Sequence, residues 1–261
     1  MSSLILLSPS SLLSISDGDT PEVKMGVRML GIDTPELHFP GTGSPDRQDP
    51  ALAGLSKSAA FQNLPGELRE HLEPRLEMAG TRQKGWSLLA KAALERIVDE
   101  ALTTYKITAS GEKKKGRRRK IFFACGEEII DCYGRVLVYA GPFMTKEERS
   151  ALGQPDTFNL RMLKEGFAVS NLHNTNLPKV EDLKLAVEAV RNAKQGKLGC
   201  WAESDLILHG YEFRALVRMA QGKVGFRYKV ADLRPHLEGQ PMKYLKAEEY
   251  ISIPEEYRIF K

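Results

Sequence analysis

The most informative stretch of the chain is residues 27–36, which read Val-Arg-Met-Leu-Gly-Ile-Asp-Thr-Pro-Glu. The apolar residues at its start predict a strand. The end is typical of a helix start, with Thr34 as N-cap and Pro35 in the first turn. Arg28 interrupts the apolar strand, which is costly unless its guanidinium faces a polar side or meets an anion. Alone, the stretch is explained as well by a strand and a helix as by a functional site.

Two further segments have the same ambiguity when each is taken alone. Residues 17–20 read Asp-Gly-Asp-Thr, and residues 131–137 read Asp-Cys-Tyr-Gly-Arg-Val-Leu. Both are typical of tight turns between strands, because Asp and Gly are common turn residues. Their joint occurrence with residues 27–36 favours a functional reading, since together they supply clustered carboxylates and two arginines.

These residue types are the ones that phosphodiester hydrolysis needs. Asp19 and Asp33 offer the oxygen ligands that a hard cation prefers. Glu36 is a candidate base for activating water. Pentavalent phosphorus carries extra negative charge, and the guanidinium groups of Arg28 and Arg135 match it with paired N–H donors.

The three segments together resemble the signature of the staphylococcal-nuclease-like (thermonuclease) family. Its pattern is Asp-Gly-Asp-Thr, then Val-Arg-Leu-Leu-Gly-Ile-Asp-Thr-Pro-Glu, then Asp-x-Tyr-Gly-Arg. Residues 159–168 are similar to the family's Asn-x-x-Leu…Gly-x-Ala helix, and residues 189–201 to its last helix and tryptophan. The resemblance covers roughly 4–36 and 84–202, a little over half of the chain.

The resemblance implies an α+β fold, with a five-stranded OB-fold-type β-barrel and flanking helices. It also implies a calcium-dependent endonuclease that hydrolyses DNA and/or RNA with little sequence specificity. Oxygen-only ligands admit Mg²⁺ or Mn²⁺ as well as Ca²⁺.

The roles of single residues follow from the same resemblance. Asp19 and Asp33 would bind the cation through carboxylates, and Thr34 through its carbonyl oxygen. Asp17 would contact these ligands without binding the cation itself. Glu36 would orient or deprotonate the attacking water, while Arg28 and Arg135 would bind the scissile phosphate. Tyr133 would lie beside the bound nucleotide.

The chain departs from the family pattern in several places. Residues 37–85 are predicted to be a helical insertion beside the active-site loop, and 113–120 an inserted basic loop. After Ala168 the family's tyrosines are missing, and His173 either stacks on a base there or lies at the surface. The predicted organisation is therefore a nuclease-like domain over 1–203 and an accessory α+β extension over 204–261.

Charge is concentrated in that basic loop. The chain has 38 basic and 34 acidic residues and a formal net charge of +4, and removing the seven charges of the loop leaves −3. The loop is either a solvated hairpin tip or a surface that contacts phosphates. We assign it to substrate binding; its charged residues are Lys113, Lys114, Lys115, Arg117, Arg118, Arg119 and Lys120.

Periodicity and turn residues predict the remaining elements. Helices are expected over 84–101, 157–168, 180–195 and about 211–221, with weak helical character over 51–80. The helix over 84–101 is predicted to be amphipathic, with Leu89 on its apolar face. Strands are expected over 4–7, 12–16, 23–32, 103–109, 120–125, 225–233 and 248–260. Residues 128–139 are expected to form a strand, a turn at Tyr133 and Gly134, and a second strand.

Composition excludes several other classes of protein. The chain has 261 residues, 42% apolar and 28% charged, which is typical of a globular fold with a buried core. No apolar run approaches the roughly 20 residues of a membrane span. The N-terminal segment lacks the basic start of a signal peptide. Three cysteines without a Cys-x-x-Cys pair indicate reduced thiols. We therefore expect a cytoplasmic protein with no membrane partner; the oligomeric state stays open.

Three functions remain for comparison. The first is a metal-dependent nuclease. The second is a barrel that binds nucleic acid or protein without cleaving, although such members would lose the carboxylates or arginines that this chain keeps. The third is an interaction protein that acts through the insertion and the extension, which weak cleavage by an intact site would favour.

Overall fold

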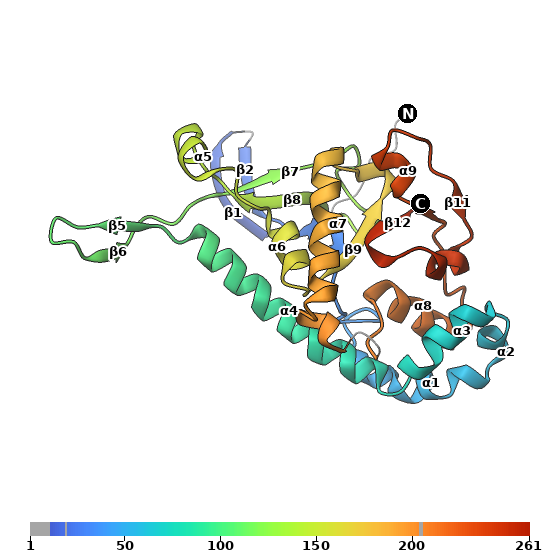
Figure 1. The fold of residues 1–261 in the computed structure, drawn as a ribbon. Helices are drawn as coiled ribbons and strands as arrows, with labels where there is room; N and C mark the ends of the chain where they lie inside the picture. Colours follow the sequence, from blue (N-terminus) through green and yellow to red (C-terminus); the bar gives the residue numbers. More distant parts are fainter. Residues whose placement is uncertain (1–10, 19, 204–205) are drawn as a thin grey trace.

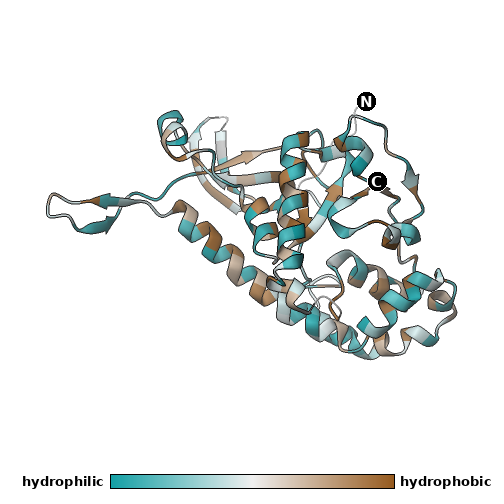
Figure 2. Ribbon diagram, in the orientation of Figure 1, coloured by the Kyte–Doolittle hydropathy of each residue, from teal (hydrophilic) through white to brown (hydrophobic). Residues whose placement is uncertain are grey.

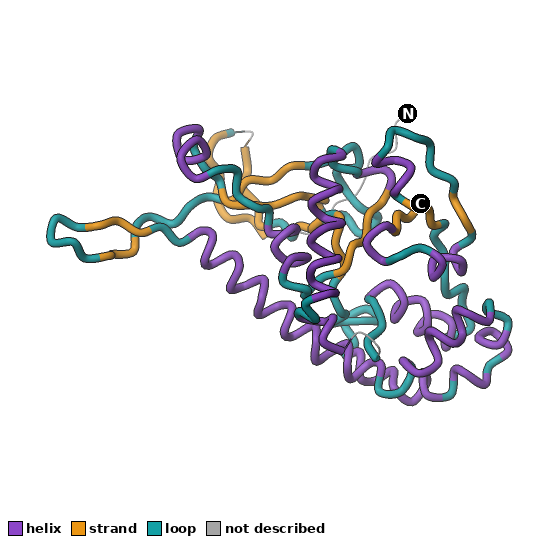
Figure 3. The backbone as a smooth tube through the Cα atoms, in the orientation of Figure 1, coloured by secondary structure: helices purple, strands orange, loops and turns teal. Residues whose placement is uncertain are grey.

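The computed structural model describes residues 11–18, 20–203 and 206–261. Helices of the insertion and the long helix α4 (Ala79–Leu102) lie along one side of the molecule, and most strands lie on the other (Figures 1 and 3). The strand predicted over 4–7 falls outside the described residues. The architecture is mixed α+β, as the sequence predicts.

The strand expected over 23–32 is divided into three short strands. They are β2 (Thr20–Lys24), β3 (Val27–Met29) and β4 (Gly31–Asp33). Gly31 has φ of +71°, and a Cβ there would lie 3.3 Å from the Tyr139 hydroxyl, so this turn requires glycine. The chain therefore changes sheets between β3 and β4.

The sheets do not close into a barrel. Strand β3 pairs in parallel with β8 (Val136–Pro142), which pairs antiparallel with β7 (Ile121–Ala124). Strand β4 pairs antiparallel with β9 (Val169–His173), in a different sheet. The hairpin of β1 (Ser11–Asp17) and β2 forms a sheet of its own. The five-stranded barrel is thus not confirmed, although the fold is consistent with an OB-type arrangement.

Three helices cover the family-like strands. They are α4, α6 (Phe158–Lys164) and α7 (Val180–Gln195), and α7 has the bounds that the sequence predicts. Their apolar faces enclose a core whose members include Ile32, Val138, Met162, Val190 and Trp201. The apolar face predicted for α4 includes one residue too many, because Leu89 is 51% exposed. Another helix, α5 (Lys146–Leu152), follows β8.

The side chain of Asn159 connects this helical layer to the strands. It is buried, donates to the Leu30 carbonyl (2.8 Å) and accepts from the Ala140 amide (3.0 Å). An Asn at the start of α6 thus satisfies backbone groups at the point where β3 ends.

The insertion is a run of short helical segments, as its weak helical pattern predicts. They are η1 (Pro45–Gln48), α1 (Asp49–Ala53), η2 (Leu55–Lys57), α2 (Ala59–Gln62), α3 (Gly66–Leu72) and η3 (Glu73–Arg75). The insertion continues into α4, which runs from α1 toward the basic loop (Figure 1).

The extension continues the β4–β9 sheet. Its elements are α8 (Gly210–Ala220), β10 (Val230–Asp232), α9 (Arg234–Leu237), β11 (Tyr244–Leu245), η6 (Ala247–Ser252), η7 (Glu255–Tyr257) and β12 (Arg258–Phe260). Strand β12 pairs in parallel with β9 and antiparallel with β10. The strand expected over 248–260 forms only at its end, because two 3-10 turns precede it.

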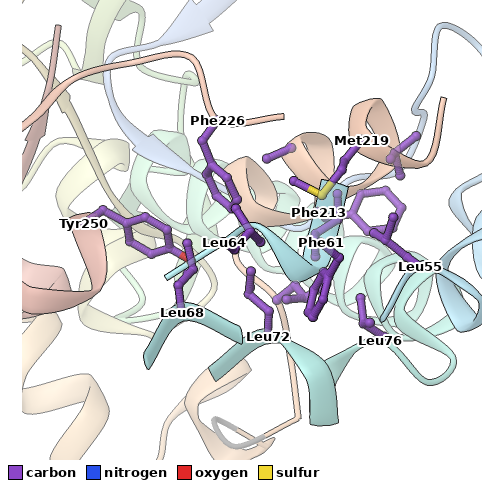
Figure 4. Close-up of a cluster of buried hydrophobic side chains, with 14 of the residues drawn as sticks. Leu55, Phe61, Leu64, Leu68, Leu72, Leu76, Phe213, Met219, Phe226 and Tyr250 are labelled. Atoms are coloured by element: carbon purple, nitrogen blue, oxygen red, sulfur yellow. The ribbon is translucent and has the colours of Figure 1, made fainter. Parts of the chain in front are cut away.

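The insertion and the extension share one hydrophobic core. Phe61, Leu68 and Leu72 from the insertion pack with Phe213 and Tyr250 from the extension, and each is at most 1% exposed (Figure 4). Two segments that lie outside the family pattern therefore fold together. The domain boundary at residue 203 stays a prediction.

The basic loop is part of a projecting hairpin. Strand β5 (Tyr105–Ile107) pairs antiparallel with β6 (Lys113–Lys115), so the strand expected over 103–109 joins the basic segment and not the larger sheets. The hairpin extends beyond the C-terminal end of α4 (Figure 1), and much of it is hydrophilic (Figure 2). Of the helices in the described part of the chain, none has the length and apolar character of a membrane span.

Candidate active site

Arg28 and Asp33 meet at the junction of the two larger sheets. Arg28 extends from β3, and its Nη2 donates to Asp33 Oδ1 (3.1 Å) and to the Ile32 carbonyl (3.1 Å). The Asp33 side chain is 2% exposed, and the Arg28 side chain 30%. The arginine inside the apolar strand thus has an anionic partner and keeps one side open to solvent.

Glu36 is positioned by a contact through its backbone. Its amide donates to Gln83 Oε1 (2.8 Å), and Gln83 Nε2 donates to the Leu208 carbonyl (2.5 Å). Gln83 lies on α4 and is fully buried. Residues 34–36 are irregular, so the helix start that Thr34 and Pro35 indicate does not form. One glutamine therefore connects Glu36 to α4 and to the start of the extension.

Arg214 is a third arginine at this site, and sequence reasoning missed it. It lies on α8, its Nη2 contacts Asp33 Oδ2 (2.8 Å) and its Nη1 contacts Asp33 Oδ1 (3.2 Å). Nη1 also pairs with Glu36 Oε1. These partners are 181 and 178 residues away, and nothing in the sequence around Arg214 indicates them.

The charges of the site affect one another strongly. Burial would raise the pKa of Asp33, but the guanidinium groups of Arg214 and Arg28 lower it below its ordinary value. Burial raises the pKa of Glu36, and Arg214 opposes this rise only in part. Asp33 is thus held as a carboxylate, and Glu36 is the more basic of the two groups.

Two of the predicted cation ligands, Asp33 and Thr34, are covered by other groups in this arrangement. Both oxygens of Asp33 accept from guanidinium groups. A Cβ on Gly210 would lie 2.6 Å from Asp33 Oδ2 and 2.7 Å from the Thr34 carbonyl oxygen, so α8 covers both groups. No cluster of three His, Cys, Asp or Glu side chains is found within the described ranges.

The remaining acidic candidates are Asp17, on the β1–β2 hairpin, and Asp19. Asp19 is outside the described residues, and Asp17 is exposed at the end of β1. Figure 1 shows this hairpin near β7 and apart from α8. The hairpin pairs with no other described strand, so no shared sheet links Asp17 to Asp33.

Arg135 and Tyr133 belong to a tight turn before β8. The Asp131 carboxylate accepts from the backbone amides of both residues and from Arg135 Nε (2.8 Å). Arg135 precedes Leu137, the β8 partner of Arg28, by two residues. The Arg135 side chain is 44% exposed and Tyr133 is 72% exposed. No contact between Arg135 and Asp33 occurs among the residues that the structure describes.

The seven charges of the basic loop differ in their surroundings. Lys113 lies over the Tyr105 ring, 4.2 Å from its centroid. Arg118 pairs with Asp99 (3.1 Å) and Arg119 with Glu148 (2.8 Å), which fixes the base of the hairpin. The lysines of β6 are exposed.

His173 is neither a free surface residue nor a stacking platform in this structure. It packs against Tyr228 and Phe260 of the extension, with ring centroids 5.6 and 6.1 Å away. Burial lowers its pKa. The extension thus fills the region after Ala168 where the family pattern has tyrosines.

Comparison with known proteins gives the family of the chain. Residues 26–203 match the family model described as staphylococcal nuclease homologue. The chain therefore belongs to this family, whose domain is generally a nuclease and which includes non-catalytic members. A search of curated proteins finds no match.

Proposed function

We propose that the protein hydrolyses phosphodiester bonds of DNA and/or RNA with little sequence specificity, in a calcium-dependent manner. The observation that carries the proposal is that Arg28 contacts Asp33, while Arg214 connects Asp33 to Glu36, so these three residues of the family-matched region share one partly exposed network. These residues come from the motif that is most specific to the family.

The reaction assigns a separate task to each side chain. Water adds to phosphorus and gives a proton to Glu36, while the bond to one ester oxygen breaks and that oxygen takes up a proton from solvent water. Arg28 and Arg135 donate to the phosphate oxygens as negative charge develops on them. Asp33 holds Arg28 in place through the 3.1 Å contact.

The test is cleavage of single-stranded DNA, double-stranded DNA and RNA by the purified 261-residue chain. We expect cleavage with added calcium and none in excess chelator, because the candidate ligands are hard oxygen donors. Undiminished cleavage in chelator would exclude the cation dependence.

A second function is favoured by the closed arrangement around Asp33. With both carboxylate oxygens paired to arginines, the same surface binds nucleic acid without cleaving it. Binding of all three substrates, with no product under any divalent cation, would support this alternative.

The exposed lysines of β6 should bind the substrate backbone away from the site of cleavage. Replacing Lys113, Lys114 and Lys115 with glutamine should weaken binding and reduce its salt dependence. Each phosphate contact contributes about 0.7–0.9 to the slope of the logarithm of the binding constant against the logarithm of the salt concentration. Loss of three contacts would lower the slope by about 2. Turnover at saturating substrate should change little, since these side chains lie on the hairpin.

The control removes three exposed lysines elsewhere: Lys57, Lys146 and Lys243. Affinity for a short DNA is measured across a salt series in the wild type and both triple variants. Equal slopes in all three proteins would show that the hairpin does not touch nucleic acid.

A further inference from the structure

Arg214 binds both carboxylates on which the proposed chemistry depends. Its two terminal nitrogens contact the two oxygens of Asp33 at 3.2 and 2.8 Å, which is the bidentate geometry of a strong arginine–carboxylate pair. The same guanidinium pairs with Glu36. The side chain is 24% exposed, so it closes the site from one side.

The helix that carries Arg214 is fixed in place. Its apolar face, which includes Phe213 and Leu216 with 0% exposure, lies in the core shared with the insertion. Its first residue, Gly210, lies so close to Asp33 and Thr34 that a methyl group would not fit. The part able to leave the site is therefore the Arg214 side chain and not the helix.

An engaged Arg214 opposes cation binding at Asp33. Calcium takes 6–8 oxygen ligands, and here Asp33 Oδ1 already accepts from Arg28 as well as from Arg214. A divalent cation on this carboxylate would also face two guanidinium charges at contact distance.

We propose that Arg214 occupies the place of the divalent cation at Asp33, and that it thereby sets the cation affinity of the site. The Arg214–Asp33 pair and the bound cation exclude each other, so the protein without metal is held inactive by its own extension. The choice of calcium as the cation rests on the proposed function.

The test is calcium binding by the 261-residue chain, measured by isothermal titration calorimetry at constant ionic strength. Arg214→Gln should bind calcium at least about tenfold more tightly than the wild type, because removing one competing charge of a close pair typically changes binding by this factor or more. Arg214→Lys, which loses the bidentate geometry but keeps the charge, should show a smaller gain.

Arg218→Gln is the matched control. Arg218 lies one helical turn further along α8 and donates to the Gly225 carbonyl (2.9 Å), not to the site carboxylates. Its calcium affinity should equal that of the wild type. Circular dichroism verifies that each variant is folded. If Arg214→Gln does not fold, Arg214→Lys is used to test the proposal. Unchanged or weaker calcium binding in both Arg214 variants would overturn the proposal.

A cleavage assay on the same samples separates this inference from the proposed function. If Arg214→Gln binds calcium more tightly but no protein cleaves, the proposed nuclease function is excluded and the competition between Arg214 and the cation is supported. If the protein cleaves but wild type and variant bind calcium equally well, the nuclease function is supported and the competition between Arg214 and the cation is excluded.

Discussion

Glu36→Gln and Arg28→Ala should each reduce turnover by at least about 100-fold, since loss of a general base or of one transition-state donor costs that much. Glu36 is the more basic carboxylate of the site, because burial raises its pKa. Arg28 keeps a 30% exposed side chain through which it meets a phosphate. Turnover is measured with saturating DNA and calcium.

Arg28→Ala carries a structural risk that Glu36→Gln does not. It leaves Asp33, which is 2% exposed, with only one arginine. Thermal melting therefore accompanies both assays, and Arg28→Lys retains one charge beside Asp33. Glu127→Gln changes an exposed acid to the same amide and should retain full turnover. Near-normal cleavage by Glu36→Gln would show that Glu36 is not the general base.

Local patterns predicted the two longest helices well, because helix formation depends on neighbours three and four residues apart. Helix α7 has the predicted bounds 180–195, and α4 includes the predicted 84–101. The strands are less well predicted. At Gly31 one apolar run divides into strands of two different sheets, and pairing with distant partners decides where each strand ends.

The candidate site is predictable only where it comes from one continuous motif. Arg28, Asp33 and Glu36 lie within nine residues, so the motif brings them together. Arg214 reaches them from the other end of the chain through α8, whose position depends on packing between the insertion and the extension. A surface arginine on an amphipathic helix has the same sequence pattern as Arg214, so periodicity does not identify its partners.

That packing depends on a buried carboxylate, Glu212, on the turn of α8 next to Arg214. Glu212 is 0% exposed and accepts from the Tyr250 hydroxyl (2.7 Å), His71 Nε2 (3.0 Å) and the His209 amide (2.8 Å). It thus connects the insertion, α8 and the last turns of the extension. Glu212→Ala should lower the free energy of unfolding by about 3–5 kcal/mol, because it leaves buried polar partners uncompensated.

Urea unfolding followed by tryptophan fluorescence measures this loss, since Trp201 is buried beside His209 with ring centroids 5.5 Å apart. The exposed Glu238→Ala should stay within about 0.5 kcal/mol of the wild type. An equal urea midpoint for Glu212→Ala and Glu238→Ala would show that the buried carboxylate does not hold the two segments together.

The pH dependence of unfolding gives an independent measure of the same carboxylate. Burial would raise the pKa of Glu212, but His209 and His71 hold it below the ordinary 4.5. The unfolded chain therefore binds the proton more readily, so the stabilisation is complete above pH 4.5 and is lost as the pH falls below it. In Glu212→Gln this loss should be absent, and the difference in unfolding free energy between wild type and variant should narrow with acid. A constant difference from pH 7 to pH 3 would mean that Glu212 has the same pKa in the folded and unfolded chain.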